Sequence, residues 1–488
     1  MATSIAAFIG WAPQGPVGQP TLVQSWGDFQ SQFGGLYGGV YLGYAVSQFF
    51  ANGGQQAYIV RLADGATIAG GEDTASNIQL WASSAGDWAN KFYVTFLAGN
   101  PSDHDSFGMQ VYDGNNNLLE SFMNVSIDPT APRFAPTVID SDSQYITFLD
   151  PATTPPQVQL PITVPAFTTP PALPHTLTFT NPGSPGTVLN DPTNANFADQ
   201  LATKALVHAL LDSAPIVNIV CVPGLTTQTA VGATAIDAVQ QFCVDARAFS
   251  IVDSSALATV TTATQGLPNT APEAANSAMY FPWVSAPDPL VGGRLSDMPP
   301  CGLVAGVYAA TDASRGVWKA PAGLDAGLGG IAGLQYTLTD LQQGSINPHG
   351  VNCLRYFPAY NNVVWGARTL LGADTVGSQW KYVPIRRFAL FLESSLYDGT
   401  QWVVFEPNDE TLWGQIRLNV GAFMQGLFLK GAFQGTTPQQ AYFVKCDAEN
   451  NPQSSINQGI VTIEVGFAPL YPAEFVIIQI QQMMAGLA

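Results

Sequence analysis

Short runs of apolar residues alternate with segments of helical periodicity between residues 197 and 313. Strands that are apolar throughout are typical of sheets buried on both faces, and alternation with helices favours parallel strand pairing. The stretch therefore predicts a small, mainly parallel sheet with helices on both faces. The expected strands are residues 216–222, 249–253 and 277–284, and the expected helices are 198–211, 229–248 and 302–313.

The first 62 residues carry a similar alternation on a smaller scale. Residues 4–10 and 57–62 are apolar runs that predict buried strands. Between them, residues 41–50 place apolar side chains at helical spacing, and the sequence Asn52-Gly53-Gly54 ends that helix. We expect a strand, a helix and a second strand in this order.

An antiparallel β module is predicted next, up to about residue 134. Its clearest element is a hairpin at residues 109–119, in which Asp113-Gly114 is expected to supply the residue with positive φ. Residues 150–192 differ in kind, because they contain 11 Pro and many Thr without helical periodicity. They predict an outward-facing, β-rich insertion or a linker, with disorder as the alternative.

The last third of the chain contains one long helix and an apolar end. A helix is expected at residues 412–429, with Asn408 as its N-terminal cap. Its continuous apolar stripe consists of Leu412, Ile416, Val420, Phe423 and Leu427. Strands are expected at residues 460–467 and 474–480. The second is apolar on both faces, which is an aggregation hazard unless another strand covers it, so we expect it to be lent to a neighbouring subunit. Its candidate linking residues are Phe475, Val476, Ile477, Ile478 and Ile480.

Charge is scarce and mostly negative. Only 10% of residues are charged, against about a quarter in an ordinary soluble protein, and the net charge is −19. A surface with so few charges indicates either extensive contacts with other subunits or a large core in a loop-rich β protein. Residues 1–150 hold 3 basic and 13 acidic side chains. This balance argues against binding to nucleic acid or to an anionic membrane, both of which require basic patches.

Cysteine usage and the N-terminal sequence favour synthesis in a cytoplasm. The five Cys are widely spaced and form no C-x-x-C pair, so we expect buried thiols and no zinc site. The first basic residue is Arg61, which leaves no basic region for a secretory signal. The most apolar run, residues 205–223, is interrupted by His208, Asp212 and Pro215, and we expect no direct membrane insertion.

No catalytic, cofactor-binding or metal-binding motif is found. The sequence lacks a Walker A loop, H-E-x-x-H, G-x-S-x-G and an EF-hand loop. Residues 327–332 imitate a dinucleotide loop but follow no clear strand, and residues 103–105 (DHD) are better explained as an exposed turn than as a metal site. An α/β enzyme with a ligand at the strand ends of residues 197–313 remains the alternative, and a β-rich surface adhesin would require an export signal.

Five motifs follow one another in the last third of the chain. They are GVWKAPAG at 316–323, VVWGARTL at 363–370, WKYVPIRR at 380–387, FEPN at 405–408 and PAEFV at 472–476. Their order and spacing closely resemble the C-terminal domain of contractile tail sheath proteins. The resemblance extends to the strand–helix–strand order at the front and to most of the chain outside residues 150–195. Family members usually begin with a further extended arm, so either the numbering starts after that arm or this member links with one strand fewer.

The resemblance implies a mixed α+β, multidomain fold. It places the N-terminal strand (residues 1–20) on a C-terminal α/β sheath domain (316–488) that carries the linking strands. A β-rich N-terminal domain (21–150), an outward insertion or linker (151–195) and an α/β middle domain (196–315) complete the expected organisation.

The resemblance also implies a structural role. The chain would polymerise helically around an inner tube and contract by rigid-body rearrangement, in a phage tail or a tail-like particle, without a catalytic residue, cofactor or metal. Its partners would be copies of itself, the inner tube protein, and baseplate and terminator or cap proteins. The helix at 412–429 would face either the tube or the subunit's own core. Candidate charges between subunits or toward the tube are Arg368, Arg386, Arg387, Glu406, Asp409 and Glu410.

Overall fold

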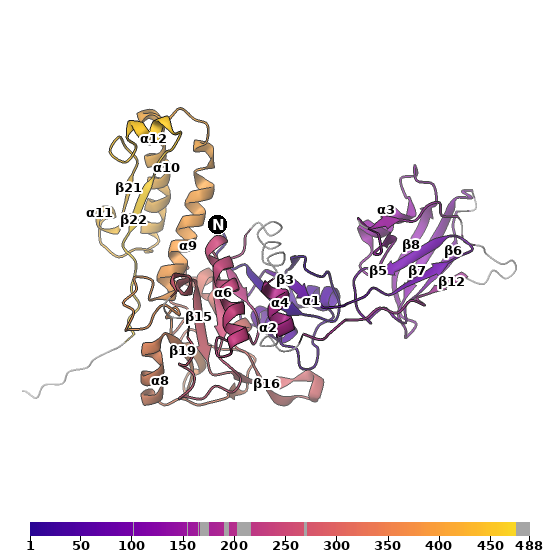
Figure 1. Cartoon of the computed structure of the whole chain (residues 1–488), viewed down its shortest axis with the longest axis horizontal. Helices are drawn as coiled ribbons and strands as arrows, with labels where there is room; N and C mark the ends of the chain where they lie inside the picture. Colours follow the sequence, from indigo (N-terminus) through magenta and orange to yellow (C-terminus); the bar gives the residue numbers. More distant parts are fainter. Residues whose placement is uncertain are drawn as a thin grey trace, which may run out of the picture.

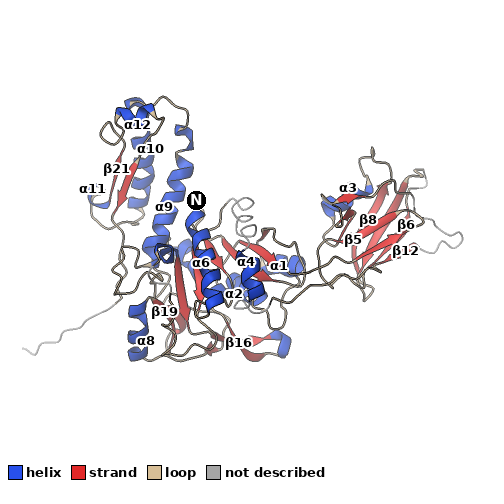
Figure 2. Ribbon diagram, viewed as in Figure 1, coloured by secondary structure: helices blue, strands red, loops and turns tan. Residues whose placement is uncertain are grey.

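The computed structural model describes residues 1–100, 102–153, 155–163, 165, 175–189, 195–202, 216–267 and 271–474. Three packed parts can be distinguished (Figure 1): a central α/β unit, an outer β unit to its right, and a C-terminal unit that rises above its left side. Each part has its own cluster of buried apolar side chains. Strands dominate the outer unit, whereas helices dominate the C-terminal unit (Figure 2).

The central unit is built on an eight-stranded sheet with the order β2-β3-β1-β13-β14-β15-β19-β20. All neighbouring pairs from β3 to β19 are parallel, and the edge strands β2 and β20 pair antiparallel. The mainly parallel sheet predicted from the apolar runs is therefore confirmed. The strands are β1 (Ala6–Trp11), β2 (Thr21–Val23), β3 (Ala57–Leu62), β13 (Ile219–Cys221), β14 (Phe249–Asp253), β15 (Ser277–Phe281), β19 (Val351–Phe357) and β20 (Asn361–Trp365).

Helices cover both faces of this sheet, as predicted. On β15, Ser277 accepts a hydrogen bond from Gln240 of α6 (Ala230–Asp245), whereas the Tyr280 hydroxyl bonds Tyr308 of α7 (Cys301–Arg315). Residues three apart on a strand point to opposite faces, so α6 and α7 lie on opposite sides. The other helices of the unit are α1 (Trp26–Phe33), α2 (Leu42–Ala51), α4 (Ala195–Ala202) and α8 (Asp340–Ile346). The remainder of the helix predicted at 198–211 lies outside the described residues.

The N-terminal strand does not occupy its expected place. β1 lies inside the central sheet between β3 and β13, and it is buried along its whole length. The neighbouring segment 21–62 and the strands β19 and β20 belong to the same sheet. Boundaries at residues 20, 150 and 315 therefore do not coincide with the packed units. The physical reason is that β1 and β3 are apolar on both faces, which suits the interior of a covered parallel sheet.

The outer β unit is formed by a segment that leaves the central sheet after β3 and returns to it beside its own start. The outgoing segment, residues 64–70, and the returning segment, residues 181–187, run side by side. They are joined by bridges between Asp64 and Thr187, Thr67 and Ser184, and Gly70 and Asn181. Just before the returning segment, β12 (His175–Thr178) pairs with β6. This part of the expected insertion at 151–195 thus completes a sheet. The unit's elements are β4 (Gly70–Asp73), β5 (Ile78–Ala82), β6 (Tyr93–Ala98), β7 (Ser106–Tyr112), β8 (Leu118–Ser126), α3 (Ala135–Asp142), β9 (Ile146–Thr147), β10 (Leu149–Asp150) and β11 (Gln157–Val158).

The β7–β8 hairpin forms as predicted, but its turn uses a different residue. Asn116 has a φ of 64°, and Gly114 is not among the residues with positive φ. The Asp113 carboxylate accepts hydrogen bonds from the backbone N–H groups of Asn115 and Asn117. This Asx-type loop organises the turn, and Asn tolerates the left-handed conformation nearly as well as Gly does.

The C-terminal unit packs two long helices against a small sheet. These are α9 (Val383–Gly399), α10 (Glu410–Leu429), and the antiparallel pair β21 (Tyr442–Lys445) and β22 (Glu464–Phe467). Two short helices, α11 (Pro438–Ala441) and α12 (Gln453–Asn457), flank the sheet. The strand predicted at 460–467 is thus shorter than expected, and the one at 474–480 lies outside the described residues beyond Glu474.

Helix α10 matches the prediction, with one correction at its start. Its N-terminal cap is Asp409, whose carboxylate accepts from the Leu412 N–H at 3.0 Å. Asn408 instead accepts from the Trp413 indole and donates to the Ile460 carbonyl. The apolar stripe is buried within the subunit's own core, so the core interpretation of this helix is the one that the packing supports.

A few short elements complete the fold. They are η1 (Pro272–Asn276), β16 (Val284–Asp288), η2 (Pro289–Val291), β17 (Arg294–Met298), β18 (Gly333–Leu334), η3 (Asn347–His349) and η4 (Gln401–Val403). All five cysteines are buried free thiols, as predicted. Among the described residues, no helix is long and apolar enough to cross a membrane.

Candidate linking site at the two chain ends

The described chain ends at Glu474, which is bound to the central unit by a buried ion pair. Arg368, after β20, donates from Nε to Oε1 and from Nη2 to Oε2 of Glu474, both at 2.7 Å. The Arg368 side chain is fully buried and that of Glu474 is 14% exposed. A bidentate arginine–carboxylate pair with low exposure fixes both position and direction. The apolar segment 475–480 therefore starts from a rigid point.

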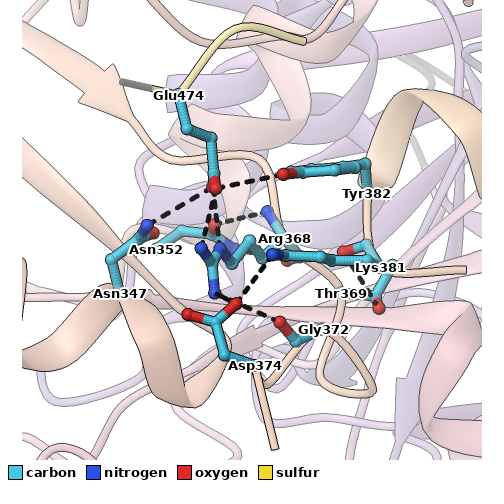
Figure 3. A network of polar contacts seen from close by, with 9 residues as sticks. All are labelled: Asn347, Asn352, Arg368, Thr369, Gly372, Asp374, Lys381, Tyr382 and Glu474. Atoms are coloured by element: carbon cyan, nitrogen blue, oxygen red, sulfur yellow. Dashed lines mark hydrogen bonds and ion pairs between the residues drawn. The ribbon is translucent and has the colours of Figure 1, made fainter. Parts of the chain in front are cut away.

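Further polar groups complete this contact (Figure 3). Glu474 also accepts from the Tyr382 hydroxyl at 3.1 Å and from the Asn347 amide at 3.3 Å. The second arm of Arg368 donates to Asp374 at 2.9 Å, and Lys381 donates to the same Asp374 oxygen at 2.7 Å. Few donors or acceptors of the pair are thus left unsatisfied, as a buried charge requires.

The electrostatics keep both members of the pair ionised. Burial alone would raise the pKa of the Glu474 carboxyl, but the hydrogen bonds and charge of Arg368, with help from Asn347 and Tyr382, lower that pKa below its usual value. Burial likewise opposes the charge on Arg368, yet Glu474 and Asp374 raise its pKa above the usual value. The contact therefore persists throughout the neutral pH range.

A second buried arginine holds the N-terminal segment. Arg387 of α9 forms a bidentate pair with Asp312 of α7, at 2.9 and 2.7 Å, and also donates to the Thr3 carbonyl at 2.9 Å. Its guanidinium lies over the Tyr308 ring at 4.7 Å. The two charged side chains are 3% and 2% exposed. Both ends of the described chain are therefore held by arginine residues inside the fold.

The small sheet of the C-terminal unit has unpaired edges. Within the described residues, β21 and β22 pair with each other and with no further strand. The open edges of this sheet carry N–H and C=O groups that can pair with additional strands. Phe443 on β21 is half exposed. The unit is therefore suited to receive extended segments from outside.

Two family models match this chain. The phage tail sheath protein central domain matches residues 208–370, and the phage tail sheath C-terminal domain matches residues 375–483. Together they span more than half of the chain. The chain belongs to the phage tail sheath family.

Similar proteins agree with this membership. The tail sheath protein of Vibrio phage KVP40 is 25% identical over 181 residues, which cover 37% of this chain and 26% of that protein. Two sheaths in the contracted state share the fold. That of the anti-feeding prophage is 22% identical with a TM-score of 0.58, covering 99% of this chain and 94% of the other. That of the extracellular contractile injection system PVC is 20% identical with a TM-score of 0.59, covering 99% and 92%.

A crystal structure of a bacterial protein shows the same fold. The sheath tail protein of Listeria innocua is 13% identical with a TM-score of 0.63, and the match covers 96% of each chain. The mixed α+β, multidomain fold class inferred from the motifs is thus confirmed.

The site explains why three of the five sheath motifs occur together. Arg368 comes from VVWGARTL, Tyr382 and Arg387 from WKYVPIRR, and Glu474 from PAEFV. The backbones of the first two motifs pair at the bridge between Arg368 and Tyr382. The sequence pattern indicated that these segments matter but not that their charges meet. A bidentate Arg–Glu contact across 106 residues leaves no spacing signal, so only the folded chain shows it.

The predicted charged residues have different surroundings from those expected. Arg368 and Arg387 are buried and paired within their own chain, so the expectation that they pair between subunits is corrected. The physical reason is desolvation, because a buried guanidinium needs compensating acceptors in the same interior, and here they are carboxylates. Arg386 donates to Asn276 and pairs with the partly exposed Glu393.

The three predicted carboxylates lie near the start of α10. Asp409 caps that helix, and Glu410 forms an ion pair with Arg417 at 2.6 Å. Glu406 is exposed. The five predicted linking residues Phe475, Val476, Ile477, Ile478 and Ile480 lie outside the described residues, so they stay a prediction.

The ligand-site alternatives have little chemistry to support them. A cleft of about 500 Å³ lies at the ends of β13 and β14, but none of its lining residues is ionisable. The glycine-rich loop at 327–332 packs on α2, where Gly329 N–H donates to Asn52. Asp103 organises a turn by accepting from Asp105 N–H. In the described part of the chain, no three His, Cys, Asp or Glu side chains are grouped as metal ligands.

Proposed function

We propose that this protein is the subunit of a contractile sheath, which polymerises helically around an inner tube and drives that tube through a target envelope. The observation that carries the proposal is the pairing of two features in one sheath-family chain. An apolar terminal segment begins at a rigid buried contact, and the same chain offers a two-stranded sheet with open edges. Donating a strand to one neighbour while receiving one from another gives a head-to-tail chain that does not close.

The receiving surface in this proposal is an edge of the β21–β22 sheet. Backbone hydrogen bonds would provide affinity, and alternate side chains of residues 475–480 would set the register. Phe475 and Ile477 would face one side, and Val476, Ile478 and Ile480 the other. This arrangement covers the apolar segment and pairs an open edge of the small sheet at the same time.

Contraction, in this proposal, is a rearrangement of rigid subunits and uses no catalytic residue. Support comes from the separate buried core of each unit and from the family's structural role. At about 25 cal/mol per Å² of apolar surface, a few hundred extra Å² buried per subunit corresponds to several kcal/mol before ordering costs. Summed over the many subunits of a sheath, this energy suffices for mechanical work while the exchanged strands keep neighbours connected.

The partners and location follow from the same proposal. Copies of this chain, the inner tube protein, and baseplate and terminator or cap proteins are the expected contacts. A baseplate and a helical sheath of the anti-feeding prophage are among the similar structures. The acidic composition fits neither nucleic acid nor an anionic membrane. We expect synthesis in a cytoplasm and assembly into a phage tail or tail-like particle.

Electron microscopy of the purified chain tests this function. We expect long hollow cylinders from the full chain and folded, unassembled subunits after removal of residues 475–488, because Glu474 and its contacts remain. Two single substitutions give a matched comparison. Ile478→Lys is expected to block assembly more strongly than the adjacent Gln479→Lys, since Ile478 would lose an apolar contact. Small discrete particles from the full chain would contradict the proposal.

A further inference from the structure

We propose that the start of α9 is the mechanical anchor of the subunit, through which the two terminal segments and the receiving sheet are joined. The anchor consists of residues 382–388, and we call it the α9 anchor. The inference rests on the proposed sheath function and adds the path along which load would pass. Three independent contacts of these seven residues carry it.

The first contact reaches the C-terminal segment. Tyr382, the residue before α9, donates its hydroxyl to Glu474 at 3.1 Å, and its backbone pairs with that of Arg368. Arg368 in turn forms the bidentate pair with the same carboxylate. A pull on residues 475–488 therefore acts first on Glu474 and then on Arg368 and Tyr382, whose backbones pair at the start of α9.

The second contact reaches the N-terminal segment. Arg387 donates to the Thr3 carbonyl at 2.9 Å and is itself fixed by Asp312. Two residues further on, Ile5 N–H donates to Asn218 before β1 enters the sheet. A load on the N-terminal segment therefore meets Arg387 ahead of the central sheet.

The third contact reaches the receiving sheet. The Phe388 ring meets Phe467 of β22 edge to face, with the ring centroids 5.4 Å apart. Phe388 also contacts Phe433 and Trp318. Helix α9 contributes buried residues to two clusters, with Val383 and Leu390 in the central one and Phe388 in the C-terminal one.

These contacts place a donated segment, an N-terminal segment and a receiving edge within seven residues of one helix. Buried ion pairs are suited to this role, because they hold direction as well as distance and lose most of their energy when one partner moves away. Load between neighbours then passes through the start of α9, which Arg368 and Asp312 tie to the central unit. The buried charged residues of the sheath motifs thus position the two terminal segments relative to α9.

The test compares cylinder lifetime with subunit stability in the full-length chain. Glu474→Gln and Phe388→Leu each weaken one contact of the anchor, and Asp312→Asn removes the carboxylate that fixes Arg387 for its contact with Thr3. We expect cylinders of each to form but to dissociate about tenfold faster or more in mild denaturant. Asp340→Asn is a first control, since it breaks an ion pair with Arg355 that lies away from the anchor and whose carboxylate is exposed. Val220→Ala in β13 is a second control that lowers subunit stability through the core.

The outcomes separate the two proposals. If cylinder lifetime falls for the anchor variants beyond the change in their subunit melting temperature, while Val220→Ala lowers melting without shortening lifetime, the anchor is supported. If lifetime simply follows subunit stability, or if Asp340→Asn acts like Glu474→Gln, the anchor is wrong although the sheath function stands. If the unaltered chain forms no cylinders, the function itself fails. Should one variant not fold, the remaining two still decide the question.

Discussion

The α9 anchor and the outer β unit are held together by different forces. Around α9, fully buried arginines pair with carboxylates from distant parts of the chain. In the outer unit, an apolar cluster supplies the core, and polar turns such as the one at Asp113 organise themselves locally. Neither matched family model extends into the outer unit. The difference indicates that buried arginine–carboxylate pairs hold the described chain ends, whereas the outer unit depends mainly on apolar burial.

The junction between the central sheet and the outer unit is held by a buried arginine that has no carboxylate partner among the described residues. Arg61 of β3 is fully buried and donates to the carbonyls of Ala12, Gly15 and Ala85, which connects the central sheet to the start of the outer unit. Burial lowers the pKa of Arg61 to about 10, because its described contacts are carbonyl dipoles rather than a carboxylate.

The largest expected effect comes from breaking the buried pair at α9. Asp312→Asn leaves Arg387 without its carboxylate, and we expect the free energy of unfolding to fall by about 3–5 kcal/mol. Urea denaturation measures this change. Asp325→Asn is the matched control, because its pairs with Arg315 and Lys319 are largely exposed and should contribute about 0–1 kcal/mol. Equal losses for the two variants would remove the basis of the comparison.

A core substitution in the outer unit should act locally. Phe107→Ala removes a fully buried ring from β7, and we expect that unit alone to lose about 3–5 kcal/mol. Calorimetry should then show a separate, earlier transition for the outer unit and an unchanged one for the rest. A single transition at lower temperature would mean that the two regions fold as one cooperative body.

Acid should weaken the contact at Glu474 through a defined protonation. The folded-state pKa of Glu474 lies below its ordinary value of 4.5, so its stabilising contribution is present above that value and is lost as the pH falls through the folded pKa. We expect the stability difference between the unaltered chain and Glu474→Gln to be constant near neutrality and to vanish in acid. Denaturation series at several pH values measure it. A difference that grows on acidification would contradict the ion-pair account.

The smallest expected effect is that of removing the outer unit. Its outgoing and returning segments run side by side, so a short Gly-Ser turn can replace residues 67–184. We expect the remaining chain to fold with a loss of about 1.5–3 kcal/mol, because Arg61 loses the Ala85 carbonyl and the Gly15 N–H loses the Ser84 hydroxyl. Circular dichroism during thermal unfolding would show it. Failure of this shortened chain to fold would show that the outer unit is part of the central core.

Most of the secondary structure follows from local patterns in the sequence. The strand at 249–253 and the strand at 57–62 coincide with β14 and β3, and the apolar stripe at 412–429 matches α10 to within two residues. These elements succeed because side-chain periodicity is a local property. The predictions for one turn and one helix cap were wrong by a few residues, since Asn116 and Asp409 occupy the positions expected for Gly114 and Asn408. Several neighbouring polar residues compete for such positions, and their hydrogen bonds are settled only when the chain closes.

Strand apolarity, helical periodicity and the order of five motifs were enough to determine the α/β character of this protein and its family. The assignment of β1 to the middle of the sheet, and the pairing of Arg368 with Glu474 and of Arg387 with Asp312, were decided only by the tertiary structure. The physical reason is that these buried arginines require compensating carboxylates in the same interior. That partner is selected by proximity in space across 106 or 75 residues, which no local pattern encodes.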